Sequence, residues 1–156
     1  MRILTVLLAV VALGGSALAQ EKKETKPKSL KLADLPAAVQ KTVQANLKGA
    51  EIKNIGKEKE DGVEQYEIET VLNGKARDFN VDSKGALLLV EEATTIEAVP
   101  AAAKATIMKK AGDGKLGVVE TFAKTGQPMM YEAAYTDAKG KKHEVLVKAD
   151  GTETKE

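Results

Sequence analysis

The residues of this chain whose types could do chemistry are few, and their order does not suit catalysis. The sequence has no cysteine and one histidine, His143. After the first nineteen residues the only serines are Ser29 and Ser83, and neither lies in a Gly-x-Ser-x-Gly nucleophile motif. A general base needs a partner within hydrogen-bonding reach, and His143 stands between Lys142 and Glu144 at the expected start of a strand. The sequence therefore predicts a protein that is not an enzyme, with no catalytic residues and no cofactor.

One spacing is similar to the start of a calcium-binding loop. Asp78, Asn80 and Asp82 occupy the alternating positions that open a helix-loop-helix calcium site. The glycine and the closing glutamate that such a loop requires are missing from the positions that follow. Phe79 and Val81 lie between the three polar residues, and this alternation is typical of a strand. A strand explains the spacing without a metal, so we predict no metal site.

The same polar positions belong to a longer acidic stripe. Glu67 and Glu69 alternate with apolar residues on the preceding expected strand, and their side chains point to the same side of the sheet. Like charges that face each other across strands are unfavourable, so nearby lysines neutralise the stripe or a partner does. We predict a partner-binding face made of Glu67, Glu69, Asp78, Asn80 and Asp82. Two alternatives stay open: the stripe binds a cation or a small cationic ligand, or it is only solvated.

The elements that must position this stripe occur twice. Residues 66–87 read YEIETVLNGKARDFNVDSKGAL, and residues 131–152 read YEAAYTDAKGKKHEVLVKADGT. Each copy has an alternating strand, a turn at Gly-Lys, a second alternating strand and a final glycine. The offset between copies grows from 64 residues at Pro36 and Pro100 to 66 at Gly85 and Gly151. Two single-residue insertions therefore align the copies, which indicates an internal duplication.

An amphipathic helix is expected before each copy, because apolar residues recur every four positions. These residues are Leu35, Val39, Val43 and Leu47 in the first helix, and Val99, Ala103, Ile107 and Ala111 in the second. A three-stranded meander has one face of core and needs a helix to cover it. We predict an α+β fold in which two tandem helix-plus-antiparallel-meander units form one sheet of six or more strands. Both helices are expected to pack on one face.

Residues 1–19 are predicted to be a signal peptide. Arg2 supplies a positive charge, residues 3–13 form an apolar run, and residues 17–19 give the small-x-small pattern of a cleavage site. The apolar run is shorter than the about 20 residues that a spanning helix needs. We expect cleavage before Gln20, a periplasmic or extracellular location, and no transmembrane segment after cleavage.

The rest of the chain divides into three expected parts. Residues 20–33 are expected to be a charged flexible tether, because they contain five lysines and Pro27 and little to bury before Leu30. Unit 1 is expected at 34–92 and unit 2 at 93–156. The chain has 24 basic and 23 acidic residues, so the loss of Arg2 with the signal peptide leaves 23 of each. This balance excludes the concentrated basic field that nucleic-acid binding needs.

The duplicated pattern resembles the PepSY-like family of exported bacterial proteins, which is described as similar to the beta-lactamase inhibitor protein (BLIP). The residues that carry the resemblance are Leu35-Pro36-Ala37-Ala38-Val39, Tyr66, Asn73-Gly74-Lys75, Val81 and Gly85. The second copy departs from the pattern by using Lys139-Gly140 at its turn. The resemblance covers nearly the whole mature chain and supplies no catalytic residue. It implies tandem helix-plus-sheet units, export, and non-catalytic binding or inhibition of another exported protein.

Overall fold

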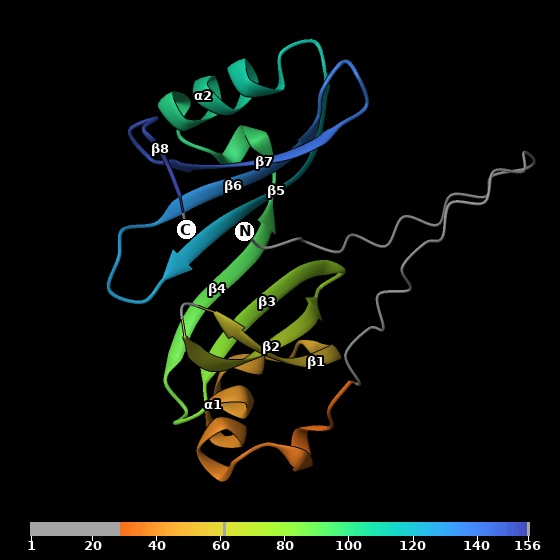
Figure 1. The fold of residues 1–156 in the computed structure, drawn as a ribbon, viewed down its shortest axis with the longest axis vertical. Coiled ribbons are helices and arrows are strands. Elements are labelled where there is room, and N and C mark those ends of the chain that lie inside the picture. Colours follow the sequence, from red (N-terminus) through yellow and green to blue (C-terminus); the bar gives the residue numbers. More distant parts are fainter. Residues whose placement is uncertain (1–28, 61, 156) are drawn as a thin grey trace, which may run out of the picture.

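The computed structural model describes residues 29–60 and 62–155, so the predicted signal peptide and residues 20–28 of the expected tether lie outside the described residues. The helical elements are η1 (Leu32–Asp34), α1 (Ala37–Leu47), η2 (Ile96–Ala98) and α2 (Ala101–Ala111). The strands are β1 (Glu51–Glu60), β2 (Val63–Leu72), β3 (Lys75–Asp82), β4 (Leu87–Thr94), β5 (Lys115–Lys124), β6 (Met130–Thr136), β7 (Lys142–Lys148) and β8 (Glu153–Thr154). This is the predicted α+β fold, with both helices on one face of one sheet (Figure 1).

The eight strands lie in the sheet in their sequence order, and each pairs antiparallel with the next. Each unit has a fourth strand beyond the expected meander of three. In unit 1 the apolar run that begins at Leu87 continues as β4 to Thr94, and β4 pairs with β3 on one side and β5 on the other. In unit 2 the fourth strand, β8, has two residues. The β4–β5 ladder therefore joins the two copies into one sheet.

The core of unit 1 lies between α1 and strands β1 to β4, as the alternation predicts. Side chains on the core side of the strands meet the apolar stripe of α1, where Val39 and Val43 have no exposed surface. The buried members of this cluster are Leu35, Val39, Val43, Ile55, Tyr66, Ile68, Phe79 and Val81. The predicted stripe and the predicted inward faces of β2 and β3 are confirmed.

A second core lies between α2 and strands β5 to β7. Its buried members are Val99, Ala103, Ile107, Val119, Ala133, Val145 and Val147. Tyr131 and Tyr135 pack against it and remain partly exposed. The duplication predicted from the sequence is therefore a duplication of packing, with smaller helix side chains in the second copy.

A glycine in the β3–β4 turn brings the sheet into contact with the backbone of α1. Gly85 has φ +92°, and a Cβ there would lie 2.8 Å from the carbonyl carbon and oxygen of Ala38. The hydroxyl of Thr42 donates a hydrogen bond of 2.6 Å to the Gly85 carbonyl. Both the positive φ and the close approach require glycine.

Unit 2 repeats this contact between its helix and its last turn. Gly151 has φ +87°, and a Cβ there would lie 2.9 Å from the carbonyl oxygen of Ala102. Thr106 Oγ1 donates to the Gly151 carbonyl at 2.8 Å. The final glycine of each copy is therefore the residue on which the helix of that unit rests.

The last residues of the expected tether contact the sheet and the core of unit 1. The amide of Leu30 donates to the carbonyl of Ile55 on β1 at 2.9 Å, and Leu30 and Leu32 pack against the core of unit 1. Residues 32–34 form η1. These contacts hold the chain against the sheet from Leu30 onward.

We predict that Gly85→Ala lowers the free energy of unfolding by about 3 kcal/mol, because it adds an unfavourable φ and a clash with the α1 backbone. Gly74→Ala is the matched control. Gly74 has φ +79°, and a Cβ added there would meet no other atom within 4 Å, so only the backbone term of about 1 kcal/mol applies. Urea unfolding measures both values. Equal losses in the two variants would contradict the packing role of Gly85.

Candidate functional site

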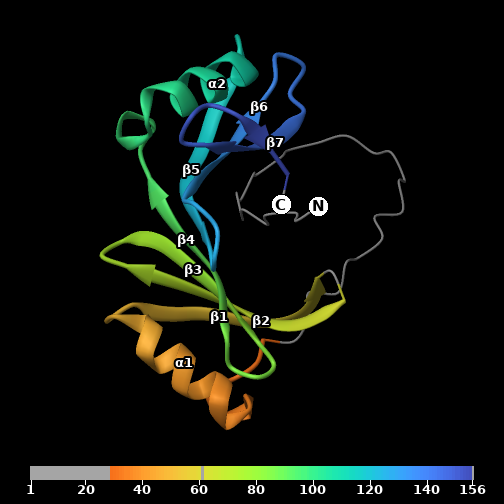
Figure 2. The same cartoon turned by 90° about the vertical axis from the view of Figure 1, so that its left-hand side faces the viewer.

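The side chains of the sheet that point away from α1 and α2 form its open face, which is concave (Figure 2). Strand alternation and register place many more carboxylates than lysines on this face. The carboxylates are Glu51, Glu58, Glu60, Glu67, Glu69, Asp78, Asp82, Glu91, Glu120, Glu132 and Glu144, and the lysines are Lys115, Lys124, Lys142 and Lys148. The open face is therefore a surface of negative potential that attracts cationic groups.

The five residues predicted for the partner-binding face all lie on the open face, but their surroundings differ. Glu67 is directly opposite Asn80 in the β2–β3 ladder. Glu69 accepts a hydrogen bond of 3.0 Å from Asn54 Nδ2. Asp82 Oδ1 accepts from the amides of Lys84 and Ala86 at 2.9 and 2.8 Å. Asp82 therefore stabilises the β3–β4 turn.

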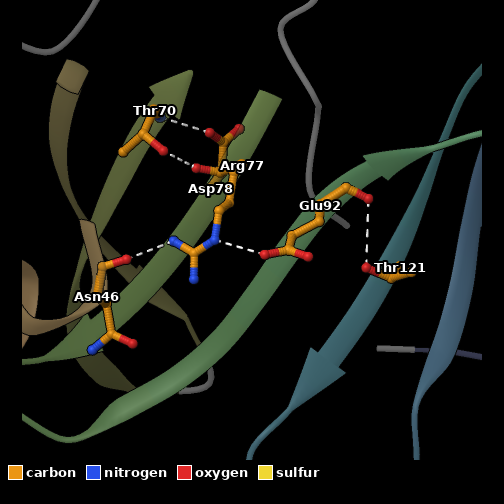
Figure 3. Close-up of polar contacts among 6 residues, drawn as sticks. All are labelled: Asn46, Thr70, Arg77, Asp78, Glu92 and Thr121. Atoms are coloured by element: carbon orange, nitrogen blue, oxygen red, sulfur yellow. Dashed lines mark hydrogen bonds and ion pairs between the residues drawn. The ribbon is translucent and has the colours of Figure 1, made fainter. Parts of the chain in front are cut away.

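Two of the five residues are tied to the interior. Asp78 Oδ1 accepts a hydrogen bond of 2.8 Å from the Thr70 amide, and the Thr70 hydroxyl donates to the carbonyl of Arg77 (Figure 3). Asn80 is 1% exposed. Glu67, Glu69, Asp78 and Asp82 remain partly exposed, so Asn80 is the one predicted residue whose side chain has almost no surface to offer a partner.

Arg77, the only arginine after residue 2, is a structural residue. Its side chain is 3% exposed, and its guanidinium lies 5.5 Å from the centre of the Phe79 ring. Arg77 Nε donates to Glu92 Oε1 at 2.6 Å and Nη1 donates to the Asn46 carbonyl at 2.8 Å (Figure 3). The cation thus meets the C-terminal end of α1, where the helix dipole is negative. Arg77 links α1, β3 and β4 and is not available as an interface anchor.

Unit 2 supplies acidic residues that the prediction from the sequence missed. Glu132 on β6 is opposite Leu146 in the same register that places Glu67 opposite Asn80. Glu144 is equivalent to Asp78 in the repeat, with the offset of 66 residues that also relates Gly85 to Gly151. The sequence repeat could have predicted these residues, because it aligns Glu67 with Glu132. The acidic surface is therefore continuous over both units.

The middle of the open face contains carboxylates with little exposed surface. Glu91, Glu120 and Glu132 are 5%, 6% and 9% exposed, and Glu120 is directly opposite Glu132 in the β5–β6 ladder. Burial, followed by the nearby charges of Asp78 and Glu144, raises the pKa of Glu120 above its ordinary value. This arrangement costs stability, and a positive charge brought to the face would relieve it.

An apolar cluster lies beside these carboxylates on the open face. Its members are Leu89, Phe122, Met130 and Leu146. Phe122 is 1% exposed, so the cluster is a packed layer and not an exposed patch.

The single histidine takes part in a local turn. His143 Nε2 lies 2.9 Å from Asp137 Oδ2, and its ring stacks on Tyr135 with centroids 5.1 Å apart. Asp137 Oδ1 also accepts from the amides of Lys139 and Lys141 at 2.9 Å. The hydrogen bond to His143 holds the pKa of Asp137 below its ordinary value. The pair closes the β6–β7 hairpin, which has a longer turn than Asn73-Gly74 gives β2–β3.

The described part of the chain holds neither a metal-binding cluster nor a membrane-spanning helix. No group of three or more His, Cys, Asp or Glu in residues 29–60 and 62–155 is placed to hold a metal ion. Over the same ranges, neither helix has the length and apolar content needed to cross a bilayer.

The fold is similar to that of several solved bacterial structures. A candidate periplasmic protein from Bacteroides eggerthii has a TM-score of 0.64 at 16% identity, with 78% of this chain and 86% of that chain covered. A DUF2874 family protein from Bacteroides uniformis gives 0.63 at 15%, covering 77% and 86%. A BLIP-like protein from Bacteroides fragilis gives 0.57 at 18%, covering 78% and 84%. At these identities the likeness concerns the fold. No protein-family model and no curated protein matches the sequence.

We predict that Arg77→Ala lowers the free energy of unfolding by about 3 kcal/mol, because it leaves a cavity and removes the donor to the Asn46 carbonyl. Lys75→Ala is the control on the same strand, since Lys75 is exposed and its loss should cost less than about 0.5 kcal/mol. Chemical denaturation measures both. A cost for Arg77→Ala no larger than that of the control would refute the structural role.

Glu120→Gln is predicted to stabilise the protein in a pH-dependent manner. Since the folded-state pKa of Glu120 lies above the ordinary 4.5, ionisation destabilises the fold as the pH rises through that pKa. The variant should therefore melt at a higher temperature than wild type at neutral pH and at the same temperature at about pH 3. Thermal melts at both pH values, with the exposed Glu97→Gln as control, measure this. A difference that is equal at both pH values would contradict it.

Proposed function

We propose that this chain is an exported, non-catalytic binding module of the PepSY-like type, which holds a basic surface of another secreted or envelope protein against its open face. The observation that carries this proposal is the gathering of carboxylates from both units on one concave face. Complementary charge gives a partner fast association and the correct orientation. The two proposed units, 34–92 and 93–156, act as one platform.

The distribution of aromatic residues sets the character of this interface. Tyr66, Phe79 and Phe122 are buried, so the open face lacks the exposed aromatic anchors that dominate many tight complexes. Binding through this face is therefore mainly electrostatic. Its affinity should fall as salt is raised, because exposed charges are screened within about 10 Å at ~0.1 M ionic strength.

The names of the similar structures agree with this proposal. The Bacteroides eggerthii protein is described as a candidate periplasmic protein and the Bacteroides fragilis protein as BLIP-like. Together with the predicted signal peptide, they support a periplasmic or extracellular location and a role as an inhibitor of, or accessory to, another exported protein.

The proposal predicts that the double variant Glu67→Lys/Glu144→Lys folds normally and loses its partner. The two substitutions place one lysine on the open face of each unit and avoid Asp82, which stabilises a turn. The control is Glu97→Lys/Asp113→Lys, which makes the same change in net charge at exposed positions outside the strands.

The measurement is retention of proteins from the exported fraction of the source cells on each immobilised variant, followed by titration of the retained protein at two salt concentrations. We expect wild type and control to retain the same partner and the open-face variant to bind it at least about tenfold more weakly. Retention of the same partner by all three would overturn the assignment of the open face.

A further inference from the structure

The two units differ in one set of equivalent positions on the open face. Glu58 pairs with Gln65 in the β1–β2 ladder as Phe122 pairs with Met130 in the β5–β6 ladder. Glu67 lies opposite Asn80 as Glu132 lies opposite Leu146. Glu58, Gln65 and Asn80 in unit 1, named the polar triad, therefore take the positions of Phe122, Met130 and Leu146, which are the three members of the apolar cluster that come from unit 2.

The polar triad is connected by hydrogen bonds and is incomplete. Gln65 Nε2 and Asn80 Nδ2 donate to Glu58 Oε1 at 2.9 and 3.1 Å, and Gln65 Nε2 also donates to Glu60 Oε2 at 2.5 Å. Asn80 Oδ1 is buried and has no hydrogen-bond partner among the described residues. Exchanging the nitrogen and oxygen of the Asn80 amide would place Oδ1 against the Glu58 carboxylate, and two acceptors would then face each other. The orientation with Nδ2 toward Glu58 is therefore favoured, and the atom without a partner is the acceptor Oδ1.

An unpaired buried acceptor destabilises a fold, and the repeat shows that leucine fits the equivalent position. Leu146 is 6% exposed and belongs to the apolar cluster. The asparagine in unit 1 is thus a costly departure from the repeat. Such departures from local consistency are typical of binding sites.

Asn80 and Gln65 line a pocket with a volume of about 360 Å³. The apolar residues of the lining on this face include Leu89 and Phe122. A pocket of this size admits a small molecule or a long side chain. The polar part of the lining includes Glu60, Gln65 and Asn80, so an occupant must bring hydrogen-bond donors to that part and apolar surface to the rest.

We propose that this pocket takes the end of an arginine side chain from the partner protein. The methylene stem would pack on Leu89 and Phe122, and the flat guanidinium would donate to Asn80 Oδ1 and to Glu60, using several donors in one plane. For this contact the Asn80 amide would turn about its soft χ2 torsion, because Oδ1 is buried in this structure. This inference rests on the proposed function, because it names the side chain that the open face recognises.

Lys124 lines the pocket beside Phe122 and lowers the affinity of the pocket for a cation. Its ammonium repels a guanidinium, and the equivalent residue of unit 1 is Glu60 by the offset of 64. Lys124→Glu should therefore tighten binding of a cation several-fold.

The test is a titration of the ¹⁵N-labelled protein with three probes: n-butylguanidinium, n-butylammonium and N-acetyl-arginine methylamide. The Asn80 and Gln65 side-chain amide resonances should move with butylguanidinium and with the blocked arginine. Asn80→Leu should weaken both probes by at least about tenfold, while it raises the melting temperature because it removes the unpaired acceptor. Glu97→Gln, at an exposed position outside the open face, is the control and should leave probe binding unchanged.

Three outcomes would overturn the proposal. These are unmoved Asn80 and Gln65 resonances in wild type, butylammonium binding at least as tightly as butylguanidinium, and butylguanidinium binding with exclusion of the blocked arginine. The last two assign the pocket to lysine or to a free small cation. The probes need no partner protein, so this test is independent of the retention experiment. If the blocked arginine binds but Glu67→Lys/Glu144→Lys still retains the partner, only the proposed function is contradicted. If the blocked arginine does not bind but that variant loses the partner, only the arginine pocket is contradicted.

Discussion

The structure depends on the contact between each helix and the backbone of one turn. At Gly85 and Gly151 the chain passes so close to the helix that no side chain fits between them, and a threonine hydroxyl one helical turn further on closes the contact. This contact fixes the height of the helix above the sheet, and hence which side chains reach the core. The opposite side of the sheet is then free to carry charge. The open face can be acidic because the helices and the core lie on the other face of the sheet.

The two units have the same order of helix and strands. At a few equivalent positions unit 1 has polar side chains and unit 2 has apolar ones. Beneath α2 two of the three buried helix side chains are alanines, Ala103 and Ala111, and unit 2 contributes Phe122, Met130 and Leu146 to the packed apolar cluster on the open face. Unit 1 has a larger core beneath α1 and places polar groups where unit 2 places that cluster. Stability is therefore supplied differently in the two halves. The half with the better core is the half that tolerates a buried, unpaired amide oxygen.

Local sequence patterns were sufficient to predict the core and the sides of the strands. The four-residue stripes at Val39 and Ala103 and the alternation at Ile68 and Phe79 specify burial directly, because a helix and a strand each have one period. Contacts between distant segments carry no such pattern. Nothing near Arg77 in the sequence indicates that it meets the end of α1, and the apolar run from Leu87 fits any buried strand, so the role of β4 as the joint between units stayed hidden.

The order of the sheet has a consequence for how the chain folds. Every strand pairs with its neighbours in sequence, so no pairing waits for a distant segment to arrive. Among the described strands the longest connection between paired strands runs from β4 to β5 through η2 and α2, and a helix shortens the span that this connection must close. Contacts local in sequence favour rapid folding. The sheet can therefore grow strand by strand from β1 as the chain becomes available, with β4 as the template on which the second unit starts.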